Sequence, residues 1–100
     1  MPEKVISLEP STSGNKKYKA IVGDTKNKRT IHFGDKRYGQ YKDSTGVGTY
    51  SKLDHNDKQR RKNYFNRHSG VDKKNEAIRK EYGKSNGKMN AKILAHKYLW

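Results

Sequence analysis

Residues 17–33 read KYKAIVGDTKNKRTIHF, and this stretch decides the fold class. Its first six residues, 17–22, place every second side chain on the same face, as expected of a β-strand. The polar residues 23–28 then predict a hairpin loop, and residues 29–33 predict a second strand. Upstream, residues 4–8 predict another short strand. Together these segments predict a β-hairpin or three-stranded meander, which needs a covering helix to be stable.

From Leu53 onward, the spacing of apolar residues changes to that of helices. Asp54 is the predicted N-cap of a first helix, which runs through His68 and ends at residues 69–70, where a glycine suits the left-handed cap. The apolar stripe of this helix comprises Tyr64, Phe65, His68 and the stem of Arg61.

Two more helices are predicted in the remaining third of the chain. Asp72 would cap the second, which ends at Tyr82 before Gly83. Its inward residues are Ala77, Ile78 and Tyr82. The third, at residues 90–100, has the clearest amphipathic pattern, formed by Ala91, Leu94, Ala95, Tyr98 and Leu99. The predicted fold class is α+β, with an N-terminal β-hairpin or three-stranded meander followed by two to three short helices.

One hundred residues make a single small domain. It divides into a β-rich part (1–35), a Tyr/Gly-rich loop (36–52) and a helical part (53–100). We expect the middle segment to be an extended linker or surface loop, because glycines interrupt it repeatedly. Hydrophobic residues make up 29% of the chain, against roughly 45–50% in an ordinary globular domain, so the core is expected to be thin.

The strongest compositional feature is positive charge. The chain has 24 Lys and Arg against 10 Asp and Glu, which gives a net charge of +14. Fourteen of these 24 cations lie in residues 51–100. Such a charge attracts polyanions, namely nucleic acid, an anionic membrane or an acidic protein surface.

Other protein classes are disfavoured by what the sequence lacks. Without cysteine there can be no disulfide and no thiolate metal site. No apolar stretch approaches the roughly 20 residues of a membrane span, so none is expected. The opening MPEKVI resembles neither a signal peptide nor a transit sequence. We therefore expect a protein used in the cytosol, the nucleus or an intracellular assembly site.

The sequence offers only weak candidates for a catalytic, metal or phosphate-binding site. The cluster at residues 54–57 combines carboxylates with a histidine, which suits a metal or nuclease site, yet aspartate at a helix start is more often a cap. Gly83-Lys84-Ser85 resembles the end of a phosphate-binding loop, but Ile78 stands where that loop needs glycine. We expect no catalytic residue, no metal, no cofactor and no small-molecule substrate.

The candidate binding residues are basic and concentrate around residues 58–62. They comprise Lys58, Arg60, Arg61, Lys62, Arg67, Lys73 and Lys74. No groove-reading module is present, so contact with nucleic acid would be made to the phosphate backbone without sequence specificity. Two alternatives remain open: a solvated helix face, and arginines that pair with carboxylates of a protein neighbour.

Aromatic residues supply a second set of candidates. Rings interleaved with lysine and arginine can stack on bases, or can anchor a protein interface. The candidate interface anchors are Tyr38, Tyr41, Tyr50, Tyr98 and Trp100.

Several short motifs follow one another along the chain: Thr30-Ile31-His32-Phe33-Gly34, Tyr38, Tyr41, His55-x-Asp57-x-x-Arg60-Arg61-x-x-Tyr64-x-x-Arg67-His68, and Leu99-Trp100. In these motifs the chain resembles, from Tyr18 onward, a family of short basic proteins encoded mainly by large nucleocytoplasmic DNA viruses of protists and algae. Two features depart from that pattern: residues 42–50 look inserted, and Trp100 is a single tryptophan where several are usual.

The resemblance implies a protein carried in virions and present in the host cytoplasm or at the assembly site during infection. We expect a non-enzymatic virion structural protein, a minor capsid or cement component that joins larger capsid subunits. Its partners would be other capsid or virion proteins, with DNA as a further candidate through phosphate contacts. The alternative is a non-specific nucleic-acid-binding protein that coats or condenses the viral genome.

Overall fold

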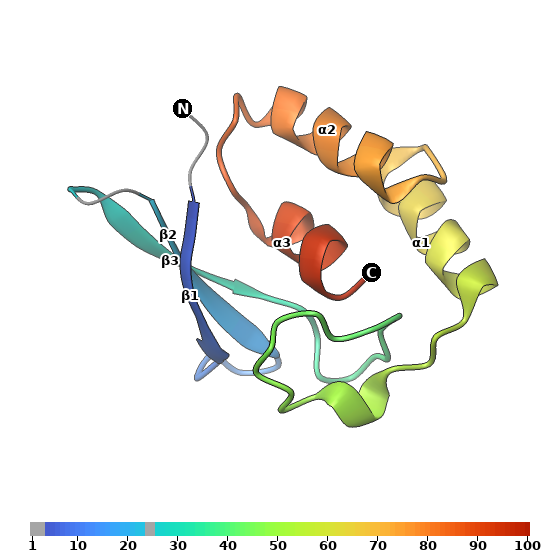
Figure 1. The fold of residues 1–100 in the computed structure, drawn as a ribbon, viewed down its shortest axis with the longest axis horizontal. Helices are drawn as coiled ribbons and strands as arrows, with labels where there is room; N and C mark the ends of the chain where they lie inside the picture. Colours follow the sequence, from blue (N-terminus) through green and yellow to red (C-terminus); the bar gives the residue numbers. More distant parts are fainter. Residues whose placement is uncertain (1–3, 24–25) are drawn as a thin grey trace.

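The computed structural model describes residues 4–23 and 26–100. The first three residues of the predicted β-rich part, and residues 24 and 25 of the predicted hairpin loop, lie outside the described residues. The elements in chain order are β1 (Lys4–Pro10), β2 (Tyr18–Gly23), β3 (Lys28–Phe33), the 3-10 turn η1 (Ser51–Leu53), α1 (Lys58–Ser69), α2 (Lys74–Lys84) and α3 (Ala91–Tyr98). Strands followed by helices make an α+β fold, as predicted (Figure 1).

The three strands form an antiparallel meander with the order β1-β2-β3. In β2, the residues Tyr18, Ala20 and Val22 are fully buried on one face, which confirms the predicted alternation. β1 was predicted to stop at Leu8, but it continues to Pro10. The end of an edge strand tolerates proline because no neighbouring strand needs its missing N–H.

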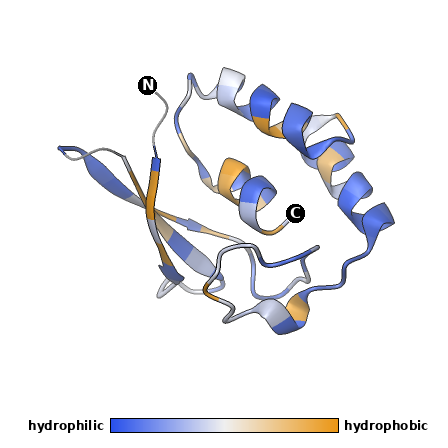
Figure 2. Ribbon diagram, viewed as in Figure 1, coloured by the Kyte–Doolittle hydropathy of each residue, from blue (hydrophilic) through white to orange (hydrophobic). Residues whose placement is uncertain are grey.

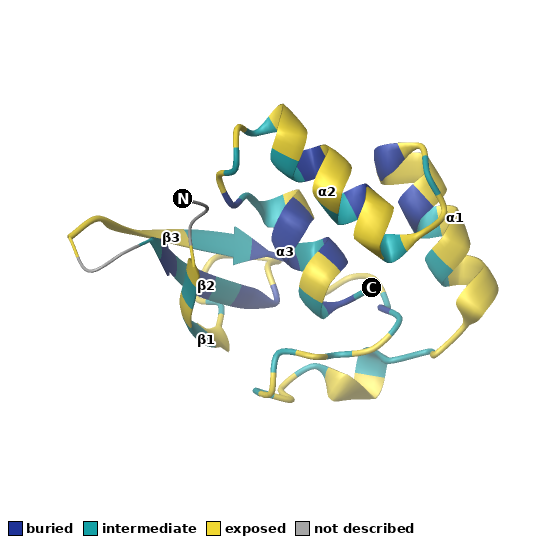
Figure 3. Cartoon of the chain, turned by 45° about the horizontal axis from the view of Figure 1, so that its top comes forward, coloured by how far each residue is buried: buried dark blue, intermediate teal, exposed yellow. Residues whose placement is uncertain are grey.

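Helix α3 lies between the sheet on one side and α1 and α2 on the other (Figure 1). Figure 2 shows apolar residues concentrated in the sheet and α3, while α1 and α2 are largely hydrophilic. The buried core cluster comprises Tyr18, Ala20, Val22, Phe33, Met89, Ile93, Leu94 and Leu99. Figure 3 shows buried segments on α3, which is enclosed on two sides. Ile93 and His96 are therefore fully buried although they lie outside the predicted stripe.

The start of α1 differs from the prediction by one helical turn. Asp57, and not Asp54, is the N-cap, and its carboxylate accepts hydrogen bonds from the backbone N–H groups of Gln59 at 3.0 Å and Arg60 at 3.1 Å. The predicted stop is correct, since Gly70 ends the helix with φ 71° in the left-handed region.

The buried face of α1 also differs in part from the predicted stripe. Phe65 and Ser69 are buried, Tyr64 and Arg61 are half-buried, and His68 is exposed. The side chain of Ser69 is buried in place of His68 because its hydroxyl group forms hydrogen bonds with Glu81 and His96 below the end of the helix.

Both ends of α2 differ from the prediction. Its N-cap is Lys73, without a side-chain cap, and the predicted cap Asp72 is exposed one residue earlier. The helix passes through Gly83 to Lys84, because a glycine in an exposed last turn costs only about 1 kcal/mol and does not force a stop. Ala77 is buried as predicted.

Residues 36–52 pack closely against the rest of the chain. Gln40 is fully buried and accepts a 2.7 Å hydrogen bond from the Lys17 ammonium group. Its side-chain amide donates to Asp54 at 2.7 Å. The backbone N–H groups of Tyr41 and Lys42 both donate to the Leu99 carbonyl oxygen. These hydrogen bonds join the predicted surface loop to both ends of the helical part, at Asp54 and at Leu99.

Candidate functional site

Most of the predicted basic residues line a groove between α1 and the start of α2. These two helices lie side by side (Figure 1), and the groove has a volume of about 600 Å³. Six cations and two carboxylates line it: Lys58, Arg61, Lys62, Lys73, Lys74, Arg79, Asp72 and Glu76. We call this site the α1–α2 groove. Five of the seven predicted binding residues belong to it, and the sequence analysis missed Arg79.

Arg61 is held in place within the α1–α2 groove. Its Nε donates a 3.1 Å hydrogen bond to the main-chain carbonyl oxygen of Trp100. Its guanidinium carbon lies 4.7 Å from the ring centre of Tyr41, in a cation–π contact. A fixed guanidinium loses little conformational entropy on binding an anion.

Positive charges crowd one another at the α1–α2 groove. Burial lowers the pKa of Lys74, and the charges of Arg61 and Lys97 lower it further. Lys62 and Asp72 form an exposed 3.6 Å ion pair, which contributes little stability because water screens the attraction, and five further cations line the groove. A bound anion would relieve the repulsion among these cations.

The two remaining predicted basic residues lie on the other side of α1. Arg60 and Arg67 are seven residues apart, which is two helical turns, so they project from the same face. Both line a separate cavity of about 730 Å³, bounded by α1, by the segment after β3 and by the residues that end α3.

The five candidate interface anchors have different environments. Tyr38 is 65% exposed. Each of the other four rings contacts a side chain of this protein: Tyr41 lies against Arg61, Tyr50 against Tyr18, Tyr98 against Phe33, and Trp100 against Tyr64. Tyr38 is therefore the candidate anchor with most of its side chain available to a partner.

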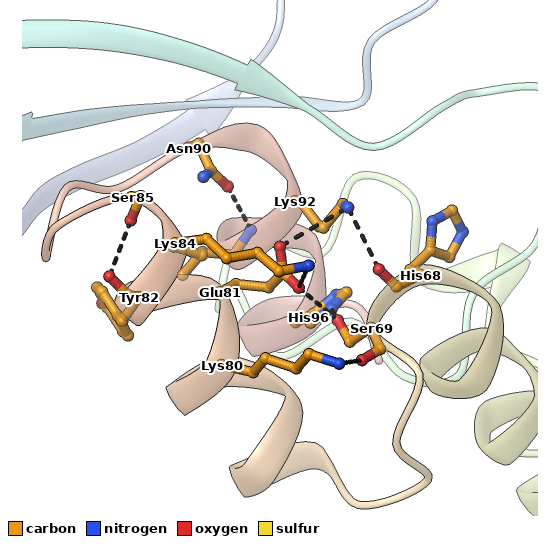
Figure 4. A network of polar contacts seen from close by, with 11 residues as sticks. His68, Ser69, Lys80, Glu81, Tyr82, Lys84, Ser85, Asn90, Lys92 and His96 are labelled. Atoms are coloured by element: carbon orange, nitrogen blue, oxygen red, sulfur yellow. Dashed lines mark hydrogen bonds and ion pairs between the residues drawn. The ribbon is translucent and has the colours of Figure 1, made fainter.

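A polar network lies buried where the three helices meet (Figure 4). Ser69 Oγ lies 3.0 Å from Glu81 Oε2 and 2.8 Å from His96 Nε2, and all three side chains are buried. On the other side of the imidazole, the Tyr64 hydroxyl lies 2.9 Å from His96 Nδ1. Along the chain, Ser69 is 12 positions from Glu81 and 27 positions from His96, so no local sequence pattern predicts this network.

The hydrogen bonds of the network assign the proton on His96. Ser69 donates its hydroxyl hydrogen to Glu81, so its oxygen accepts from His96 Nε2–H. Nδ1 is then the acceptor for the Tyr64 hydroxyl. The nitrogen facing the serine carries a proton and is no base towards it, so these residues do not form the nucleophile–base pair of a hydrolase.

The surroundings set the pKa values within the network. Burial lowers the pKa of His96 to about 4. For Glu81, burial by itself raises the pKa, but the hydrogen bond from Ser69 and the charges of Lys92 and Lys84 outweigh it, so the pKa is lowered. Glu81 is thus a buried carboxylate with two ammonium groups at 3.7 Å, and it ties α2 to α3.

Residues 54–57, which were considered as a metal or nuclease site, mostly make hydrogen bonds that hold the fold together. Asp54 accepts from Gln40 and from the backbone of Asp43, and Asp57 caps α1. His55 Nδ1 accepts from the Asp57 backbone N–H at 3.0 Å, and its Nε2 is buried without a partner. Within the described residues, no group of three or more His, Asp or Glu is placed to hold a metal ion.

Among the helices of residues 4–23 and 26–100, none is both long and apolar enough to cross a membrane.

Comparison with known proteins identifies one family. Residues 6–68 match DUF5754, described as a family of unknown function. No curated protein and no solved structure matches the chain. The matched segment contains most of β1, all of β2 and β3, the 36–52 segment and nearly all of α1.

Proposed function

The chain belongs to the DUF5754 family, and we propose that it is a non-enzymatic protein that binds the phosphate backbone of nucleic acid through the α1–α2 groove. One observation carries this proposal: of the residues that the structure describes, six cations and two carboxylates line a single groove of about 600 Å³. The binding would coat or condense a nucleic acid without reading its sequence.

Phosphate is the favoured ligand for three reasons. A net charge of +14 draws a long polyanion from a distance and raises the rate of encounter. Within the groove, Arg61 offers a fixed guanidinium, which suits the oxygens of a phosphate. The exposed ammonium groups of Lys58 and Lys73 can follow the backbone on either side as point charges.

The test is the salt dependence of binding to a 20-base-pair duplex of arbitrary sequence. Six phosphate contacts give a slope of about −5 when the logarithm of the affinity is plotted against that of the salt concentration. Lys58→Ala and Lys73→Ala should each reduce the slope by about 1. Lys28→Ala is the matched control, because Lys28 is equally exposed but lies in β3, away from the groove.

A flat salt dependence, or no binding at 0.1 M salt, would contradict the proposal. So would a Lys28→Ala variant that loses as much slope as the two groove variants, because binding would then follow net charge and not the groove.

A second candidate function is that of a virion structural protein, a minor capsid or cement component that joins capsid subunits. Tyr38, 65% exposed, and Ile6, 48% exposed on the edge strand β1, favour it because exposed apolar groups on a basic surface suit protein neighbours. Virions treated with salt or mild detergent would be fractionated into shell and DNA. Recovery of the protein with released DNA and not with the shell would overturn this candidate.

A further inference from the structure

The cavity on the far side of α1 combines aromatic rings with cations. It has a volume of about 730 Å³, within the range of small-molecule sites. Three rings and three cations of its lining matter here: Tyr38, Tyr64, Trp100, Lys16, Arg60 and Arg67. We call it the aromatic cavity.

The aromatic side of this cavity is flat and rigid. Tyr64 and Trp100 stack with ring centres 4.2 Å apart and planes 5° from parallel. Tyr64 is further fixed by its hydrogen bond to His96. Tyr38 adds a third ring, which is 65% exposed and lies 5.8 Å from the guanidinium carbon of Arg37. Tyr64 also contacts the His68 ring, with centres 4.6 Å apart, and Trp100 contacts the His55 ring, with centres 5.2 Å apart, so the exposed Tyr38 is the ring on which a planar group can stack.

The cationic side of the cavity carries excess positive charge. Arg60 and Arg67 are exposed on the same face of α1, two turns apart. Asp35, the one Asp or Glu among the described residues of the lining, is held by Arg37 through hydrogen bonds of 3.0 Å and 2.8 Å, so its charge is already paired. A ligand that suits both sides is a flat aromatic group joined to an anion.

From this arrangement we infer that the aromatic cavity binds an unpaired nucleotide, either free or within a single strand. The base stacks on Tyr38 beside the Tyr64–Trp100 pair, and the phosphate lies between Arg60 and Arg67. The inference rests on the proposed nucleic-acid binding and adds a preference to it. A duplex hides its bases in the stack, whereas a single strand can present one to the cavity.

The chain carries its own probe, because Trp100 is its single tryptophan and lines the cavity. Trp100 fluorescence would be titrated with adenosine monophosphate, with adenosine, with a ten-nucleotide deoxyadenosine strand and with the matching duplex. We expect the nucleotide and the strand to change the emission at lower concentrations than adenosine, because only they bring a phosphate to the arginines.

Two variants test the two sides of the cavity. Tyr38→Ala should weaken binding of the strand by about 5- to 100-fold, the range for the loss of one base–aromatic contact. The double variant Arg60→Ala/Arg67→Ala should weaken the nucleotide more than adenosine. All three side chains are exposed, so both proteins should fold. Lys28→Ala, exposed in β3 and outside both sites, is the control and should leave the Trp100 response to the nucleotide unchanged.

The outcomes separate the inference from the proposed function. If the duplex binds with the predicted salt slope while Trp100 responds to no nucleotide or strand, the inference is wrong and the proposed function stands. If neither duplex nor strand binds, both are wrong. If Tyr38→Ala and the arginine variant bind as the unaltered protein does, the cavity is not the site even where Trp100 responds.

Discussion

Tyr64 of α1 and Trp100, two residues beyond α3, stack face to face with their ring centres 4.2 Å apart. The contact joins two segments that lie 36 positions apart in the chain. Arg61, one turn before Tyr64, strengthens the same junction by donating to the main-chain oxygen of Trp100. Arg61 lines the α1–α2 groove, whereas Tyr64 and Trp100 line the aromatic cavity, so this junction links the two candidate sites.

Trp100→Ala should lower the free energy of unfolding by about 2–3 kcal/mol, because it removes the stacked pair and a large half-buried ring. In a domain of this size, that corresponds to a fall in Tm of roughly 10–20 °C. Tyr38→Ala is the control and should change stability by less than about 0.5 kcal/mol, since Tyr38 is mostly exposed. Equal losses in the two variants, measured by urea unfolding, would contradict the role of the stack.

Asp57→Ala should lower stability by about 1 kcal/mol, because Asp57 caps α1 by accepting from two backbone N–H groups. Asp72→Ala removes an exposed aspartate that caps no helix, and it should cost less than about 0.5 kcal/mol. Thermal unfolding of the two variants side by side checks the difference. A larger loss in Asp72→Ala would mean that the cap of α2 is assigned wrongly.

Stability should fall as the pH falls from about 6.5 to 4, because of His96. Histidine in an unfolded chain titrates near 6.5, whereas in the folded protein the pKa of His96 is lowered to about 4. Between these values the unfolded state binds more protons, so the free energy of unfolding rises with pH across this window. The full effect is about 3 kcal/mol.

His96→Gln should flatten this pH dependence, because glutamine does not titrate and still offers a donor to Ser69 and an acceptor to Tyr64. Urea unfolding at four pH values between 4.5 and 7.5 measures the slope. An unchanged slope in the variant would show that another group carries the effect.

Gln40→Leu should lower stability by about 2–4 kcal/mol. The substitution takes the acceptor from the buried Lys17 ammonium and the donor from Asp54, and it leaves two charged groups with fewer partners. Gln59→Leu is the control, since Gln59 is exposed on α1. Similar stabilities for the two variants would mean that the 36–52 segment does not depend on Gln40.

Much of the fold was predictable because it depends on local patterns. Alternation in β2 and the apolar spacing in α3 gave the right element types, and the glycine at position 70 gave the right end of α1. The N-caps at Asp54 and Asp72 were wrong, because several aspartates can start a helix and tertiary contacts choose among them. Asp54 is engaged with Gln40, which leaves the cap to Asp57.

The candidate sites were predictable in composition and not in arrangement. The sequence identified the cations, but it could not divide them between the α1–α2 groove and the aromatic cavity, because that depends on how α1 is rotated against its neighbours. It also placed Tyr41, Tyr50, Tyr98 and Trp100 together with Tyr38 as candidate anchors. Those four rings are half-buried, whereas Tyr38 is 65% exposed.

The sequence by itself determined the sign of the charge, the strands and the helices, since these follow from composition and from the spacing of neighbouring residues. Only the tertiary structure decided which polar groups are buried. Lys17, Gln40, Glu81 and His96 look like surface residues in the sequence, and each is buried. Each is buried because a partner far away in the chain satisfies its hydrogen bonds or its charge, and no local pattern encodes such a meeting.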